Sequence, residues 1–153
     1  MKTEMQLINN LNQLIESQTE QAISVYQAAF AELPYLEAFT ADESIAALQY
    51  ILDKDGDLLI GQDEDDLVSL AGGYLQSDGT YYIEELAVRP DKQGEGIGRE
   101  MLESLIELGL KRNPNVLEVR TTASNTKAIP LYLDEDFTMS RIREVVAKKR
   151  QDG

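Results

Sequence analysis

The 153-residue sequence contains no cysteine and no histidine. It can therefore form no disulfide, thiol nucleophile, Ser-His-Asp triad or ordinary zinc site, and no metal is expected. Catalysis would have to use carboxylates, tyrosine, lysine, backbone amides or a bound cofactor. No apolar run approaches the roughly 18 residues that span a bilayer, and the N-terminus lacks a signal-peptide core. These absences predict a soluble, cytoplasmic protein.

Positive charge is scarce as well. Fourteen Lys and Arg residues stand against 28 Asp and Glu residues, which leaves a net charge of −14. Such a surface repels nucleic-acid phosphate and anionic lipid, so neither nucleic acid nor membrane is an expected partner, and cationic partners are favoured. The length predicts one domain, residues 1–153. The oligomeric state, monomer or homodimer, stays open.

Apolar periodicity predicts an α/β fold. Helices are expected at about residues 17–31, 41–52, 96–110 and 128–135. Strands are expected at residues 5–9, 58–62, 67–75, 80–88 and 116–122, with one or two more within 138–149. Asp78-Gly79 is a hairpin signal between two of these strands. Strands 80–88 and 116–122 flank a helix as a βαβ unit, so they should be parallel.

Two acidic runs, Asp53–Asp57 and Asp63–Asp66, are interpreted as solvated surface charge. The first has the alternating acids of a calcium loop. A calcium loop needs glycine at its sixth position, and Leu58 stands there. The second is interpreted as a hairpin turn.

A glycine-rich segment, Gln93–Gly98, opens the helix expected at 96–110. A helix N-terminus offers unsatisfied N–H groups to a phosphate, and glycines let a ligand approach the backbone. The segment fits neither a Walker loop nor a dinucleotide fingerprint, because Gly98 is followed by Arg99 and Glu100. It does fit the pattern Gln/Arg-x-x-Gly-x-Gly/Ala.

On these residues the chain resembles the GNAT superfamily of N-acetyltransferases. The glycine-rich segment is similar to the family's pyrophosphate loop for acetyl-coenzyme A, and Glu84–Pro90 resembles its fourth strand. Asn125-x-x-Ala-x-x-Leu-Tyr132, followed by Phe137, resembles the second coenzyme motif. Where the family usually has Gly-Phe, Asp136 precedes Phe137. Lys92 and Arg99 are expected to offset the added charge of Glu95.

The resemblance implies a GNAT-like mixed sheet, antiparallel in its N-terminal half, with two splayed parallel strands behind it. It also implies acetyl-CoA as co-substrate, with one backbone amide near residues 86–88 facing the thioester oxygen. The residues it assigns to the coenzyme are Leu86, Ala87, Val88, Gln93, Gly94, Glu95, Gly96, Ile97, Gly98, Arg99 and Asn125. Tyr132 matches the general acid, and a core aromatic is its alternative role. Asn125 has the alternative of a helix cap.

Alternation along strand 80–88 predicts two faces. One would carry Tyr82, Glu84, Leu86 and Val88, and the other Ile83, Glu85 and Ala87. By resemblance Glu84 occupies the position of a base, while Glu85 would bind the acceptor or be structural. The alternative is that both are ordinary solvated acids.

The resemblance also implies that the first two helices and their connection line the acceptor site. The residues assigned to the acceptor are Tyr35, Glu37, Tyr82 and Glu85. The net charge favours a primary amine of a small cationic molecule or of a protein. Two other functions stay open: a non-catalytic acetyl-CoA-binding module and an acidic protein-interaction domain.

Overall fold

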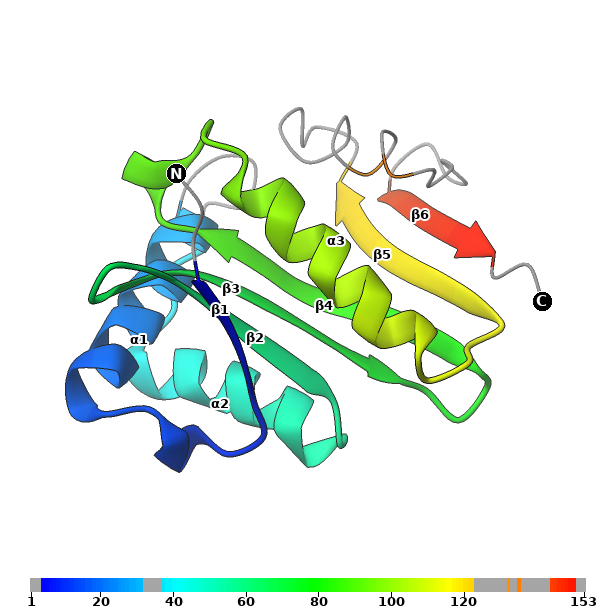
Figure 1. The fold of residues 1–153 in the computed structure, drawn as a ribbon, viewed down its shortest axis with the longest axis horizontal. Coiled ribbons are helices and arrows are strands. Elements are labelled where there is room, and N and C mark those ends of the chain that lie inside the picture. The colour runs from blue at the N-terminus through cyan, green and yellow to red at the C-terminus, as the bar shows by residue number, and fades with distance from the viewer. Residues whose placement is uncertain (1–3, 32–36, 123–131, 133–134, 136–143, 151–153) are drawn as a thin grey trace.

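The computed structural model describes residues 4–31, 37–122, 132, 135 and 144–150 (Figure 1). The helices of this part of the chain are α1 (Glu16–Ala31), α2 (Ala41–Asp53) and α3 (Ile97–Leu110), with short 3-10 turns η1 (Leu11–Gln13) and η2 (Pro90–Lys92). Its strands are β1 (Glu4–Ile8), β2 (Asp57–Asp63), β3 (Asp66–Leu75), β4 (Thr80–Val88), β5 (Val116–Thr122) and β6 (Glu144–Arg150).

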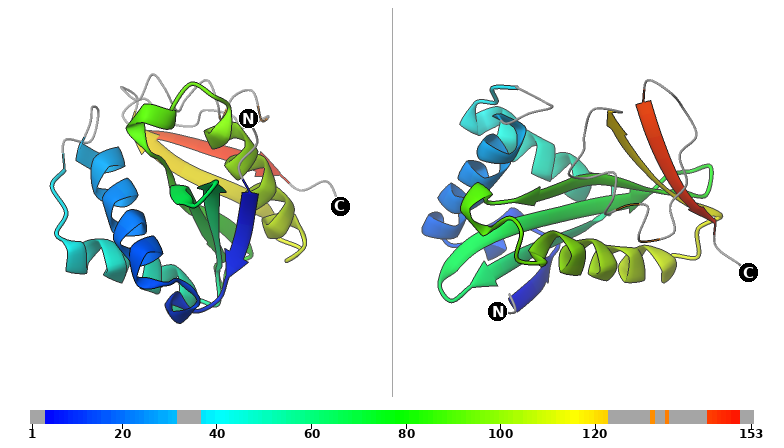
Figure 2. Two further views of the ribbon diagram at one scale, coloured as in Figure 1. Left: turned by 60° about the vertical axis from the view of Figure 1, so that its left-hand side comes forward. Right: turned by 90° about the horizontal axis from the view of Figure 1, so that it is seen from above.

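The six strands form one mixed sheet in the order β1-β2-β3-β4-β5-β6. All neighbours are antiparallel except β4 and β5, which are parallel as predicted. Pairing of β4 with β5 ends at Ile83 and Val119, although both strands continue. The two strands therefore splay beyond that pair, and β5 and β6 turn away from the other strands (Figure 2).

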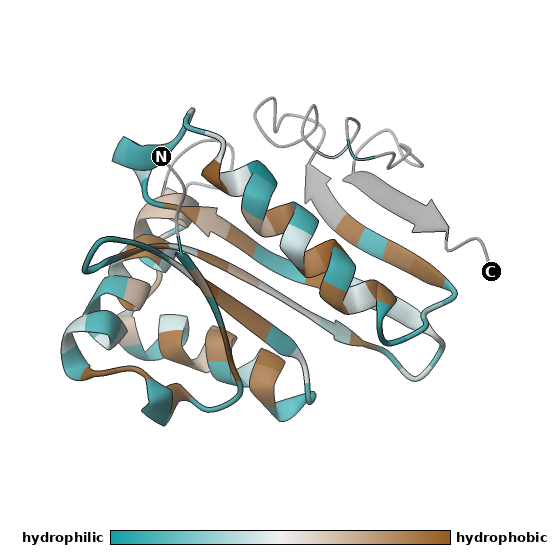
Figure 3. Cartoon of the chain, in the orientation of Figure 1, coloured by the Kyte–Doolittle hydropathy of each residue, from teal (hydrophilic) through white to brown (hydrophobic). Residues whose placement is uncertain are grey.

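Helices cover both sides of the sheet. One side, the α1/α2 face, is covered by α1 and α2, and the other, the α3 face, by α3 (Figure 2). Each face has its own buried apolar cluster, built around Leu48 and Ile51 on one side and Met101 and Leu105 on the other. Along the helices polar and apolar stretches alternate, as a half-buried helix requires (Figure 3). No helix among the described residues is long and apolar enough to cross a membrane.

Local signals explain where most elements begin and end. Thr40 caps α2: its hydroxyl accepts from the Glu43 amide at 3.1 Å, and the Glu43 carboxylate accepts from the Thr40 amide at 2.9 Å. The β3–β4 hairpin forms with Gly79 at a left-handed φ of 88°, over a connection of residues 76–79. The predicted helix at 128–135 lies almost wholly outside the described residues.

A β-bulge at Glu84 overturns the predicted faces of β4. Gly72 pairs with Glu85 and Gly73 with Ile83, so Glu84 is an extra residue with no pairing partner of its own on β3. The alternation is therefore offset by one residue at this point. The core on the α3 face holds Ile83 and contacts Leu86 and Val88, whereas Ala87 belongs to the core on the α1/α2 face. The prediction that Ile83, Glu85 and Ala87 share a face is wrong.

The acidic run before β2 also differs from its interpretation as surface charge. Asp57 is only 5% exposed, and its carboxylate accepts from the Tyr81 hydroxyl at 2.8 Å. Arg112, just after α3, donates to both oxygens of Asp57 at 2.9 and 3.2 Å. The Tyr81 ring packs directly over Gly73 and Gly109, where an added Cβ would lie 2.7 Å from ring atoms. Asp57 thus ties β2, β4 and the end of α3 together.

Replacing Asp57 with alanine is expected to destabilise the fold by about 3 kcal/mol, because it leaves a buried tyrosine hydroxyl and a half-buried guanidinium without their acceptor. Chemical denaturation monitored by circular dichroism measures this loss. Asp55→Asn is the control, since the Asp55 side chain is fully solvated (102% relative exposure) and lies 4.0 Å from the same arginine. Asparagine removes the charge and tolerates the left-handed φ of 55° at this position. Equal losses in the two variants would contradict a buried anchoring role for Asp57.

Candidate functional site

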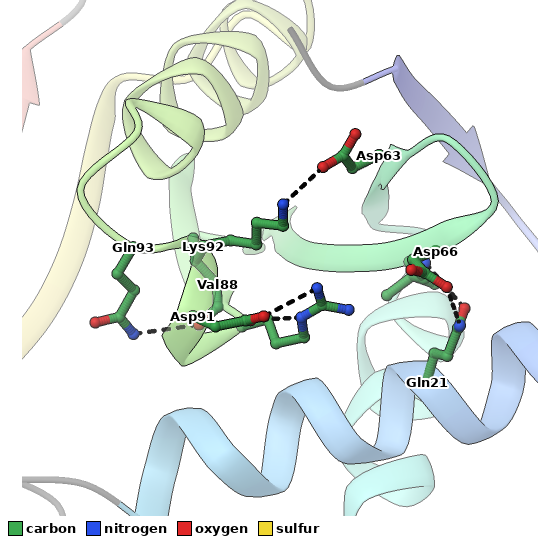
Figure 4. A network of polar contacts seen from close by, with 9 residues as sticks. Gln21, Asp63, Asp66, Val88, Asp91, Lys92 and Gln93 are labelled. Atoms are coloured by element: carbon green, nitrogen blue, oxygen red, sulfur yellow. Dashed lines mark hydrogen bonds and ion pairs between the residues drawn. The ribbon is translucent and has the colours of Figure 1, made fainter. Parts of the chain in front are cut away.

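The connection from β4 to α3 is held in place by its own side chains and by the β2–β3 hairpin (Figure 4). Arg89 pairs with Asp91 at 2.6 Å, and Lys92 with Asp63 at 3.0 Å. The Gln93 amide donates to the Val88 carbonyl at 3.2 Å, which closes the loop over η2. These contacts bring the glycines that follow to the start of α3.

Two glycines give the loop an open backbone. Gly94 and Gly96 adopt left-handed φ angles of 85° and 86°, which glycine tolerates best. Apart from the adjoining backbone, no heavy atom of the described residues lies within 4 Å of where a Cβ would stand at either position. Gly96 is the N-cap of α3 and supplies no capping side chain, while Ile97 anchors the helix start in the core. No side chain at Gly94 or Gly96 therefore covers the start of α3, and a helix N-terminus suits a phosphate group.

The two cations expected to balance Glu95 are engaged elsewhere. Lys92 pairs with Asp63, and Arg99 lies 3.5 Å from the Glu135 carboxylate. Both partners are acidic residues outside the loop. The hydrogen bond to Asp63 is the main cause of the raised pKa of Lys92, and the charge of Glu95 adds to it. That Lys92 and Arg99 together offset Glu95 stays a prediction.

A second polar group lies on the α1/α2 face, next to the bulge of β4. Glu85 is 7% exposed, and its Oε1 accepts from the Tyr26 hydroxyl of α1 at 3.1 Å. Its Oε2 is buried and has no hydrogen-bond partner among the described residues. Burial, reinforced by the charges of Glu84 and Glu37, raises the pKa of Glu85 to about 8.

Glu84 lies on the same side of the sheet as Glu85. Its negative charge helps to raise the pKa of Tyr26, Tyr74 and Glu85, although burial is the main cause at each. Glu84 is only partly buried, and it follows Ile83, the last residue of β4 that pairs with β5. Two carboxylates, one buried with a pKa near 8 and one partly exposed, therefore meet where the strands part. Such a pair can bind a cation and accept a proton.

The family model described as "Acetyltransferase (GNAT) family" matches residues 13–137. The chain belongs to the GNAT acetyltransferase family. This confirms the resemblance drawn from the glycine-rich segment.

Relatives and solved structures agree with this family. The [ribosomal protein bS18]-alanine N-acetyltransferase of Escherichia coli is 43% identical over 58 residues, which is 38% of this chain and 39% of that protein. A ribosomal-protein-alanine N-acetyltransferase structure from Brucella melitensis is 17% identical with a TM-score of 0.79, covering 97% of this chain and 99% of that one. The PaiA N-acetyltransferase of Thermoplasma acidophilum, solved with coenzyme A, is 11% identical with a TM-score of 0.69, covering 97% and 99%.

The aligned segments span well under half of the curated relatives, 37–39% of their length. At 17% and 11% identity, these two structures show the fold of this chain and say nothing about its substrate. Among the described residues, no cluster of three or more acidic side chains is arranged to hold a metal ion.

Several residues predicted from the GNAT resemblance come together on β4 and the loop after it, and others do not. Leu86 and Val88 are partly buried, Ala87 is buried, and Glu95 is exposed at the start of α3. Tyr132 is 6% exposed and belongs to the core on the α3 face, which leaves both of its predicted roles open. Tyr35 and Asn125 lie outside the described residues.

Tyr26 was missed as a polar partner of the site. In the sequence it is one more apolar member of the α1 stripe. In the structure its ring packs against both Phe30 and Phe39, with centroids 4.8 and 5.3 Å away. Its hydroxyl nevertheless reaches Glu85. A buried tyrosine hydroxyl usually has a polar partner, and that is the signal that could have found it.

Proposed function

We propose that the protein is an acetyl-CoA-dependent N-acetyltransferase whose acceptor is a cationic primary amine. The observation that carries this proposal is the carboxylate pair Glu84–Glu85 at the bulge where β4 leaves β5. Family membership supports the transferase chemistry. The buried Oε2 of Glu85, which has no hydrogen-bond partner in the described part of the chain, supports a cation as its ligand.

The glycine-rich loop would hold the coenzyme. No described residue crowds the Cβ positions of Gly94 and Gly96, which would leave room for a pyrophosphate against the first amides of α3. Gln93, Ile97, Gly98 and Arg99 complete that stretch. The residues assigned to the rest of the coenzyme are Leu86, Ala87 and Val88 at the unpaired end of β4, and Asn125. When bound, the coenzyme supplies an acetyl thioester. A backbone amide of residues 86–88 would stabilise the oxyanion.

The acidic pair would act on the acceptor. Glu85, buried beside Tyr26, holds the ammonium group, with Glu37 adding negative charge nearby. Glu84 accepts the proton that the amine must lose before it attacks, directly or through water. The hydroxyl of Tyr132 donates a proton to the leaving sulfur. Tyr35 and Tyr82 are assigned to the acceptor as well.

Coenzyme binding is tested by Gly96→Asp, with Gly96→Ala as its matched control. Both variants strain the left-handed backbone, but only aspartate places a negative charge beside the pyrophosphate. We expect the aspartate variant to bind acetyl-CoA about tenfold or more weaker than the alanine variant in isothermal titration calorimetry.

Equal affinity of the two Gly96 variants would contradict the loop assignment. A parent protein that does not bind acetyl-CoA would contradict the proposed function itself. Circular dichroism of each variant separates lost binding from lost folding.

A further inference from the structure

The glycine-rich loop has little stiffness of its own. Gly94 and Gly96 adopt their left-handed φ angles without strain, but glycine also has more alternative conformations than any other residue. The positions of the loop amides therefore depend on what holds the chain on either side. On the α3 side, Ile97 is 3% exposed and belongs to the core. On the other side, Lys92 stands two residues before Gly94, and its side chain reaches out of the loop.

The contact that Lys92 makes is an ion pair with the β2–β3 hairpin (Figure 4). Its Nζ lies 3.0 Å from Oδ2 of Asp63, the last residue of β2. The two side chains are only 22% and 11% exposed, so salt and water screen this pair less than one at the open surface. The pair joins the loop to a strand that is not its neighbour in the chain.

Asp63 is itself held in place by the hairpin. It pairs with Asp66 at the end of the β2–β3 ladder. Oδ1 of Asp66 accepts from Nε2 of Gln21 in α1 at 2.9 Å, and Oε1 of Gln21 accepts from the Leu67 amide at 2.9 Å. Contacts therefore run from α1 through the hairpin to the loop, and Asp63 has a fixed position from which to hold Lys92.

We propose that Asp63 is a positioning residue for coenzyme binding, because its ion pair with Lys92 holds the glycine-rich loop where its amides meet the pyrophosphate. This inference rests on the coenzyme binding of the proposed function. A carboxylate near a phosphate site weakens binding by its charge alone, so any gain from Asp63 must come through Lys92. The alternative is that Lys92 binds the phosphate itself and that Asp63 competes for it. The two roles predict opposite effects of removing the Asp63 charge.

Isothermal titration calorimetry with acetyl-CoA tells these roles apart. Asp63→Asn keeps the size of the side chain and breaks the ion pair, so Kd should rise about two- to fivefold. Asp65→Asn is the matched control, since Asp65 is exposed between β2 and β3 of the same hairpin and the variant removes the same single charge. Its Kd should equal that of the parent or fall slightly.

Lys92→Met shows whether Asp63 acts through Lys92. This variant should bind acetyl-CoA about as weakly as Asp63→Asn, and the double variant should bind no more weakly than either. In steady-state kinetics, KM for acetyl-CoA should rise about two- to fivefold while kcat stays the same. A variant that is merely less stable would lower kcat and the number of binding sites, and it would leave Kd and KM unchanged.

Four results decide between these readings. If Asp63→Asn binds acetyl-CoA as tightly as Asp65→Asn, or more tightly, Asp63 does not position the loop, and the proposed function stands. Additive losses in the double variant would likewise contradict a role exerted through Lys92. If the variants behave as expected but no amine is acetylated, the proposed transfer fails and the role of Asp63 in coenzyme binding stands. A parent protein that does not bind acetyl-CoA overturns both.

Discussion

A Glu84→Gln variant is expected to lose about 10²–10⁴-fold in turnover while binding acetyl-CoA as the parent does. Glutamine keeps the shape and the hydrogen-bonding groups of the side chain but cannot take up the amine's proton. The acidic limb of the pH–rate profile, which reports the protonation of this base, should weaken or shift. Steady-state kinetics over a pH series at saturating acetyl-CoA measures both effects.

Glu103→Gln is the control for this experiment, since Glu103 is exposed on α3, on the other face of the sheet. If Glu85→Gln abolishes the acidic limb and Glu84→Gln does not, the two carboxylates have exchanged roles. Parent-like profiles in both variants would mean that the amine arrives neutral and that no carboxylate base is needed.

A Glu85→Gln variant is expected to remove a pH dependence from the stability of the fold. The folded protein holds the Glu85 proton up to a pKa of about 8, whereas the ordinary pKa of a glutamate is about 4.5. Between these two values the folded state binds more protons than the unfolded chain, so this group makes stability fall as pH rises. The fall should amount to several kcal/mol, on the order of 4, and end above pH 8.

Burying the glutamine amide of Glu85→Gln lowers the free energy of unfolding by an amount that does not vary with pH. The slope of the free energy of unfolding against pH is therefore the quantity to compare. Denaturation at pH values from 5 to 9 gives this slope for the parent, Glu85→Gln and the control Glu103→Gln. The Glu85 variant should show the flatter curve. Parallel curves for all three proteins would mean that Glu85 titrates like an exposed glutamate.

The same pKa governs how the proposed acceptor binds. A cationic amine stabilises the ionised form of Glu85, so its binding should release a proton from Glu85 below about pH 8 and tighten as the pH approaches that value. Tyr26 opposes the shift by donating to the carboxylate, which makes it a positioning residue for Glu85.

The element order and the parallel β4–β5 pair could be predicted from the sequence because they depend on local signals. Apolar periodicity, the Thr40 cap, Gly79 and the glycine-rich segment each act over a few neighbouring residues. The predicted strands 58–62 and 67–75 accordingly match β2 and β3 to within one residue at each end.

The features that were missed depend on contacts between distant parts of the chain. The bulge at Glu84 is set by pairing with Gly72 and Gly73 on β3, and strict alternation along β4 cannot reveal it. In the sequence Asp57 is one acid in a charged run. In the fold it is buried and accepts hydrogen bonds from Tyr81 and Arg112, which lie far along the chain. Because the bulge brings Glu84 and Glu85 to one face, the charge pattern of the site also differs from its prediction.

The central claim is acetyl transfer from acetyl-CoA to a cationic amine at the β4 bulge, and the release of free coenzyme A thiol measures it most directly. The parent protein would be incubated with acetyl-CoA and a panel of mono- and diamines, with acetylated product confirmed by mass spectrometry. We expect thiol release that requires an amine, saturates with both substrates and falls about 10²–10⁴-fold in Glu84→Gln. Tight binding of acetyl-CoA without amine-dependent thiol release would contradict the claim and identify a coenzyme-binding module instead.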